Sequence, residues 1–229
     1  MAVSIPEKHI AKAIARFEAR SKKPVESTDS GPAANIITLS RDYGTDGHAI
    51  GKIVAEKTGA SLWDREILDV LAGESGWKLQ ARMFEALDEK AQNSIDAVVA
   101  DFFGSVERDN YYHLLPKAIY TIAQEDAVII GRGAHLILPH AFRVKIEASP
   151  ETRIAAVCAL EGIDEKSARQ KVQQIDKERV GFIKQLSKII PVKPAQLEYD
   201  LRINTDTLST NCAAQIIINA FECFMDDLK

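Results

Sequence analysis

A strand, a loop with two glycines and a helix follow one another between residues 35 and 58. Residues 36–40 form the short apolar run of a buried strand, and a helical pattern begins near Gly47. This order brings free backbone N–H groups and the positive end of a helix dipole to one point, which favours a bound phosphate. The segment therefore predicts a phosphate-binding loop at the carboxyl end of a strand.

The loop departs from the P-loop pattern G-x-x-x-x-G-K-[ST], in which the lysine contacts phosphates and the hydroxyl residue binds magnesium. With Gly44 aligned on the glycine before the last Gly-Lys pair, Asp46 replaces the second glycine and Gly47 the lysine. His48 offers a donor or a partial positive charge, and Lys52, one turn further, is a substitute for the missing lysine. The alternative is a strand-to-helix turn that needs its glycines for backbone reasons alone. The phosphate-binding candidates are Arg41, Tyr43, Gly44, Thr45, Asp46, Gly47, His48 and Lys52.

Short apolar runs alternate with helical patterns along the rest of the chain. Strands are expected at residues 61–63, 127–130, 142–148 and 199–204, and helices at 47–58, 113–123, 163–190 and from 209 onward. Such alternation predicts an α/β fold, a three-layer α/β/α core in which helices cover both faces of a parallel sheet.

The domain is expected to cover residues 35–229, after an N-terminal helix and linker over residues 1–34. Residues 5–20 have an amphipathic helical pattern, whereas residues 21–34 are rich in Ser, Pro and Gly. Two roles stay open for this helix: docking on its own domain, or binding a partner or a membrane surface.

Composition argues against several classes of protein. The 229 residues include 46% hydrophobic and 27% charged residues, with a net charge of -4, whereas nucleic-acid binders more often carry a basic face. The three cysteines show no C-x-x-C spacing, which argues against a disulfide framework or a zinc site and favours a reducing, cytoplasmic location. The sequence has no transmembrane run and no apolar signal core, so we expect neither a membrane span nor secretion.

Two further polar clusters follow predicted strands. Asp64 and Arg65 come directly after residues 61–63 and offer a base or metal ligand and a phosphate clamp; the alternative is a helix N-cap beside a surface ion pair. Arg132 lies between two glycines after residues 127–130 and suits a phosphate; the alternative is a buried arginine paired with a carboxylate. Because parallel strands end at one edge of a sheet, we expect both clusters to lie beside the glycine loop.

The charged helical segment 163–190 carries the residues of a mobile lid. Its candidates for closing over phosphates are Arg169, Asp176, Lys177, Arg179 and Lys184. The alternative is a solvated helix face with pairs such as Asp176 and Arg179.

Six motifs in this order resemble the cytidylate kinase-like family, a group within the P-loop nucleoside monophosphate kinases. The resemblance runs from about Ile36 to the C-terminus. The motifs are ITLSRDYGTDGHAIGKIVAEKTG, WDREIL, VIIGRGAHLIL, VKIEASPETRI, IDKER and YDLRINT.

The resemblance implies a P-loop kinase fold with a helical insertion at about residues 76–125 and a lid at about 160–192. It implies transfer of the ATP γ-phosphoryl group to a nucleoside monophosphate such as CMP or dCMP, with magnesium as cofactor. Arg132, Arg153, Asp176 and Arg179 would be catalytic, and Asp64, Arg65 and Arg132 would bind the acceptor. No residue is assigned to the metal.

The chain also departs from this family. Asp46 and His48 replace a glycine and an arginine of the loop, and Leu160 replaces an arginine expected in the lid. Fewer positive charges mean weaker stabilisation of phosphoryl transfer. A non-catalytic nucleotide-binding or regulatory protein, and a kinase for another acceptor, therefore remain alternatives. The helical region between residues 78 and 125 suits a homodimer face as well as a substrate pocket.

Overall fold

Five parallel strands form the centre of the computed structural model, which describes Phe17 and residues 34–73, 77–103, 111–190 and 198–227. Their order across the sheet is β2-β3-β1-β4-β5, and every pair of neighbours is parallel. The strands are β1 (Ile36–Arg41), β2 (Ser61–Trp63), β3 (Ala127–Ile130), β4 (Phe142–Glu147) and β5 (Leu201–Asn204). The predicted α/β fold with a parallel sheet is confirmed.

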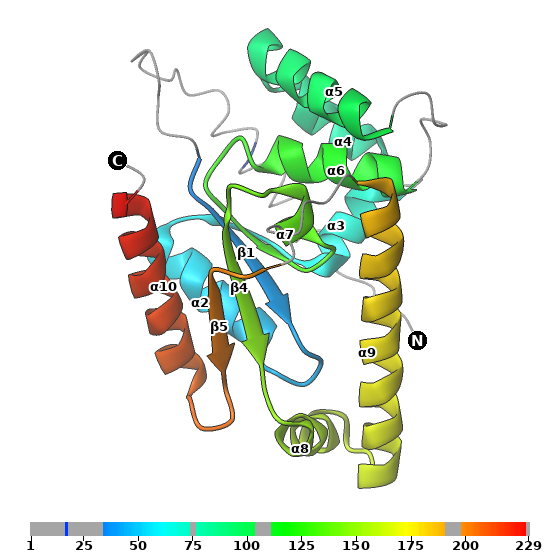
Figure 1. The fold of residues 1–229 in the computed structure, drawn as a ribbon, viewed down its shortest axis with the longest axis vertical. Coiled ribbons are helices and arrows are strands. Elements are labelled where there is room, and N and C mark those ends of the chain that lie inside the picture. The colour runs from blue at the N-terminus through cyan, green and yellow to red at the C-terminus, as the bar shows by residue number, and fades with distance from the viewer. Residues whose placement is uncertain (1–16, 18–33, 74–76, 104–110, 191–197, 228–229) are drawn as a thin grey trace.

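Helices cover both faces of this sheet (Figure 1). On one face lie α2 (Gly47–Thr58) and α10 (Thr210–Asp227), which share an apolar core with alternate residues of β1, β3 and β4. On the other face lie α3 (Arg65–Ala72), α6 (Tyr111–Ile122) and the short α7 (Ala134–Ile137), which cover β1, β2 and β3. Both layers bury β3 completely, which explains its uninterrupted apolar sequence.

Strand β4 differs from β3 because its residues alternate. Phe142, Val144 and Ile146 are buried against α10 and α2, whereas Arg143 and Lys145 point to the opposite face and are only partly buried. Charged side chains on this half of the sheet are therefore available to a site at its edge.

The remaining helices form two groups, each made of helices that follow one another in the sequence. Helices α4 (Trp77–Glu85) and α5 (Glu89–Phe103) pack beside α3 and α6, within the segment predicted as a helical insertion. Helices α8 (Pro150–Glu161) and α9 (Glu165–Ile189) pack against each other, and α9 runs along the side of the molecule (Figure 1). Ser149 and Asp164 cap these two helices by accepting the amide hydrogens of Thr152 and Ser167.

The structure adds α7 to the elements expected from the sequence. The proposed N-terminal helix and linker lie outside the described residues, except for Phe17 and Ala34. Phe17 packs edge-to-face on Trp63 at 6.4 Å between ring centroids. Among the described residues, none of the helices has the length and apolar character that crossing a membrane requires. The domain boundaries stay a prediction.

Candidate functional site

A cavity of about 710 Å³ lies between the carboxyl ends of β1, β3 and β4 and the helix α9. Basic side chains dominate its charged lining. The basic residues are Arg41, Arg65, Arg132, Lys145, Arg153, Arg179 and Lys184, and the acidic ones are Asp42, Asp176 and Glu178. A cavity with this excess of positive charge suits an anionic ligand.

Arg41 lies at the centre of this charge. Its guanidinium nitrogen Nη1 lies 2.5 Å from where a Cβ on Gly131 would be, and its Cβ and Cγ lie 2.8 Å from a Cβ placed on Gly47. The two glycines therefore leave the space that the arginine side chain fills. Burial, and then the positive charges of Arg179 and Arg65, lower the pKa of Arg41 to about 10. Cations held this close repel one another, and a bound phosphate would relieve that repulsion.

Arg132 follows β3 in a strained backbone. Its φ of 50° is left-handed, between Gly131 at 83° and Gly133 at 69°, and such strain often marks functional sites. Its Nε and Nη2 donate to the two carboxylate oxygens of Asp69 on α3, and its guanidinium lies 4.9 Å from the ring centroid of Phe182. Arg132 is therefore paired with a carboxylate, as the alternative of a structural arginine requires, and its side chain also lines the cavity.

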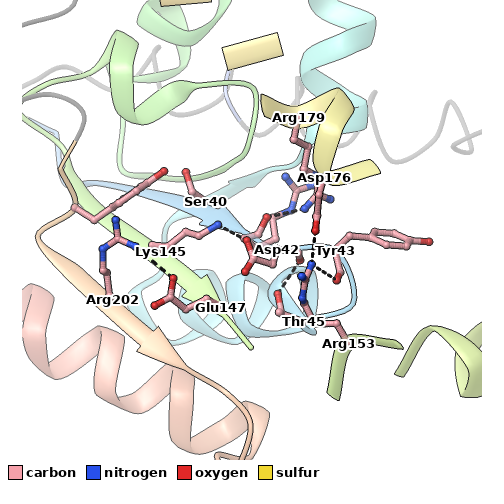
Figure 2. Close-up of polar contacts among 12 residues, drawn as sticks. Ser40, Asp42, Tyr43, Thr45, Lys145, Glu147, Arg153, Asp176, Arg179 and Arg202 are labelled. Carbon is pink, nitrogen blue, oxygen red and sulfur yellow. Dashed lines mark hydrogen bonds and ion pairs between the residues drawn. The ribbon is translucent and has the colours of Figure 1, made fainter. Parts of the chain in front are cut away.

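Arg153 and Arg179 connect α9 to the end of β1 and to the glycine loop. Figure 2 shows Arg153 donating through Nη1 to Asp176 at 2.8 Å and to the carbonyl of Tyr43 at 3.5 Å. Arg179 donates to the carbonyl of Arg41 at 2.6 Å. Within the described part of the chain, Nε of Arg153 is buried and has no hydrogen-bond partner. A buried donor without a partner on the cavity wall is a position where an anion would gain a bond.

Several predicted loop residues do not line the cavity. Gly44 packs under α8, because a Cβ there would lie 2.7 Å from the carbonyl oxygen of Arg153. The Thr45 hydroxyl is buried and donates to the carbonyl of Asp42 at 3.0 Å, which closes the turn. The hydroxyl of Tyr43 donates to Glu161 on α8, away from the strand ends.

The charged residues around the start of α2 also point away from the cavity. Asp46 is exposed at the N-cap position, and its side chain makes no capping hydrogen bond. His48 lies 3.6 Å from the carboxylate of Asp64, which itself caps α3 by accepting the amide hydrogen of Ile67. Gly47 begins α2. Lys52 lies 3.9 Å from Glu56, and both side chains are exposed on the outer face of α2.

The structure brings in residues that the sequence analysis did not single out. His135 of α7 is buried, with Nδ1 3.2 Å from the Ser40 hydroxyl and Nε2 3.3 Å from the Tyr199 hydroxyl. Burial, and then the charges of Arg143 and Lys145, lower its pKa to about 4, so the ring is neutral at pH 7. Its neighbours come from β1, from β4 and from the segment before β5, so no local sequence pattern could have indicated this cluster.

Lys145 and Asp69 are two further residues found only in the structure. Lys145 reaches the cavity from β4 and forms an ion pair with Asp42, whereas Asp69 fixes the guanidinium of Arg132. The alternation of polar and apolar residues in β4 could have indicated that Lys145 faces away from the core. The sequence could not have predicted that Asp42 is the ion-pair partner of Lys145.

The chain was compared with known families and structures. It matches the model of the cytidylate kinase-like family over residues 36–207. An uncharacterized protein from Eubacterium ventriosum has a TM-score of 0.62 at 24% identity, and the alignment covers 82% of this chain and 98% of that chain. A shikimate kinase from Bacteroides thetaiotaomicron has a TM-score of 0.45 at 15% identity, covering 84% and 98% of the two chains. No curated protein matched the chain.

The likeness to the Eubacterium structure concerns the fold, and it extends over nearly all of that protein. The family match begins at the first residue of β1 and ends after β5, so it includes the sheet, the glycine loop and α9. The chain therefore belongs to the cytidylate kinase-like family.

Proposed function

We propose that this kinase-like protein binds ATP and transfers its γ-phosphoryl group to a phosphate-bearing acceptor, most simply CMP or dCMP. The observation that carries the proposal is the convergence of Arg41, Arg132, Arg153 and Arg179 on one cavity, from segments far apart in the sequence. Phosphoryl transfer depends chiefly on positioning and on neutralising the charge of the phosphates, and guanidinium groups do both.

The residues present fit a nucleotide phosphate with magnesium. The unpartnered Nε of Arg153 is a free donor, and the carboxylates of Asp42 and Asp176 line the same cavity. The described residues contain no cluster of three or more metal-ligating side chains, but Mg²⁺ is commonly bound through one or two carboxylates and the substrate phosphates. Magnesium, when bound, would neutralise part of the phosphate charge.

In this proposal Arg132 has a different task from Arg41 and Arg179. Arg132, oriented by Asp69, would hold the acceptor phosphate so that its oxygen forms a bond to the γ-phosphorus. The bond from that phosphorus to the bridging oxygen breaks, and its electron pair leaves with ADP. Arg41 and Arg179 would stabilise the negative charge during transfer, and α9, whose residues line the cavity, would exclude water from it.

A second candidate function is nucleotide binding without catalysis. The exposed carboxylate of Asp46 lies at the start of α2. A negative charge at this position would weaken the binding of a phosphate at the N-terminus of the helix. In addition, Leu160 is 85% exposed on α8, near the position where the resemblance to the family leads us to expect a lid arginine. Both features favour a protein that binds a nucleotide but turns it over slowly or not at all.

Calorimetric titration with ATP and magnesium, with and without CMP, followed by an ADP-release assay on the same sample, separates the two functions. Binding with ADP release that depends on CMP or another nucleoside monophosphate supports the kinase. Binding without ADP release across these acceptors supports the non-catalytic function. The absence of any nucleotide binding would contradict both proposals.

A further inference from the structure

The glycine loop has no lysine of its own, and the two basic residues that follow it are engaged elsewhere. His48 faces Asp64 and Lys52 faces Glu56, and both lie on the exposed surface of α2, outside the cavity. In a P-loop protein the lysine of the loop contacts the β- and γ-phosphates as a point charge. If a lysine contacts a phosphate in this cavity, that lysine must therefore come from an element other than the glycine loop or α2.

Lys145 reaches the cavity from the neighbouring strand. In the register of β1 and β4, Lys145 lies opposite Ser40, which is the last residue but one of β1. Lys145 is therefore close to the carboxyl end of β1. On the same face of β4, Arg143 is paired with Asp200 and Glu147 with Arg202. Of the three, Lys145 is the one that lines the cavity.

An ion pair with Asp42 fixes the position of the Lys145 ammonium (Figure 2). The amide of Asp42 donates to the carbonyl of Ile146 at 3.0 Å, so the first residue after β1 is bound to β4 beside the lysine. The two side chains are 19% and 26% exposed, and an ammonium group has three donors. The described residues account for one of these donors, through Asp42, and the others are available to a ligand in the cavity.

We propose that Lys145 is the phosphate-binding lysine of this site, supplied by β4 in place of the lysine that the glycine loop lacks. Its ligand is the triphosphate of a nucleotide, and Asp42 is the positioning residue that aims the ammonium group at it. Arg41 and Arg179, which line the same cavity, supply the neighbouring positive charge. This inference rests on the proposed function, because it assigns one more residue to the same phosphate site.

The test compares Lys145→Ala, Lys145→Gln and Lys145→Arg with Arg143→Ala in the full-length protein. Arg143→Ala is the matched control, because it breaks a similarly buried ion pair on the same face of β4 outside the cavity. Calorimetry with inorganic tripolyphosphate, and separately with ATP and magnesium, measures binding, and thermal unfolding measures fold. We expect about 10- to 100-fold weaker binding for the Ala and Gln variants, partial recovery for Arg, and no change for the control.

Asp42→Asn provides a test with the opposite sign. Without magnesium it removes a negative charge next to the ligand, whereas the amide oxygen of the asparagine still accepts a hydrogen bond from the Lys145 ammonium and keeps it in position. Tripolyphosphate should therefore bind more tightly than to the wild type. The inference is overturned if the wild type binds ATP and tripolyphosphate but the Lys145 variants bind equally well, or if Asp42→Asn leaves binding unchanged. It is also overturned if Lys52→Ala, rather than Lys145→Ala, weakens binding. A wild-type protein that binds neither probe would instead contradict the proposed function itself.

Discussion

At the scale of single residues, the cavity combines groups that weaken the fold unless a ligand compensates them. Arg41 is held among other guanidinium groups, and its lowered pKa shows that its charged form is less favourable here than in water. Arg132 adopts a left-handed backbone that non-glycine residues seldom take. Such groups persist where function needs them.

Gly47→Ala tests whether the position of Arg41 matters for binding. The new methyl group would lie 2.8 Å from Cβ and Cγ of Arg41, so the arginine must move, although α2 itself accepts alanine. We expect a loss of about 1–3 kcal/mol in the free energy of unfolding, together with weaker binding of ATP by calorimetry. Gly51→Ala is the control on the same helix, since its methyl group would meet Ile130 at 2.6 Å in the core instead. Equal ATP affinity in the two variants would contradict the role given to Arg41.

His135 makes the stability of the fold depend on pH in a defined window. Its pKa is lowered to about 4 in the folded protein, whereas an unfolded histidine titrates near 6.5, so the unfolded chain binds more protons between these values. Its contribution to stability is complete above pH 6.5 and is lost as the pH falls toward 4. Urea unfolding at pH 7 and pH 5 should show a loss of about 2 kcal/mol that His135→Asn removes. A variant with the pH dependence of the wild type would contradict this assignment.

At the scale of elements, local patterns predicted most of the fold. The helix expected at residues 47–58 is α2 with the same bounds, because apolar residues recur at helical spacing and Gly59 follows its end. Helix α7 was missed, since four residues are too few to show a period. The pairs between Lys145 and Asp42, and between Arg132 and Asp69, could not be predicted, because they depend on which strands and helices become neighbours.

Two glycines, one in α9 and one in the loop after β3, predict stability changes of opposite sign. Gly181 lies exposed inside α9, and a Cβ there meets nothing within 4 Å, so Gly181→Ala should stabilise the protein by about 0.5–1 kcal/mol. Gly133 has a φ of 69°, and a Cβ there would lie 2.3 Å from Cδ2 of Leu186, so Gly133→Ala should destabilise it by at least about 1 kcal/mol. Chemical denaturation measures both, and two shifts of the same sign would contradict the packing of α9 against the loop after β3.

At the scale of the whole molecule, the site lies where an open parallel sheet commonly places one. Strand β1 has β3 on one side and β4 on the other, and ligands of such sheets bind outside the carboxyl ends of strands where the order reverses. The sequence located this edge through its glycine loop and Gly-Arg-Gly motif. It did not show that Arg179 of α9 donates to the carbonyl of Arg41 at the end of β1, or that Asp176 of α9 forms an ion pair with Arg153 of α8.

The most direct test of the central claim is the transfer of radiolabel from γ-³²P-ATP to CMP, with dCMP and other nucleoside monophosphates assayed in parallel. The account predicts labelled product with the wild type, a rate about 100- to 1000-fold lower with Arg179→Ala, and an unchanged rate with the control Arg143→Ala. A wild-type protein that binds ATP but labels none of these acceptors, or an Arg179→Ala variant that transfers label at the full rate, would contradict the claim that this arginine-lined cavity is a phosphoryl-transfer site.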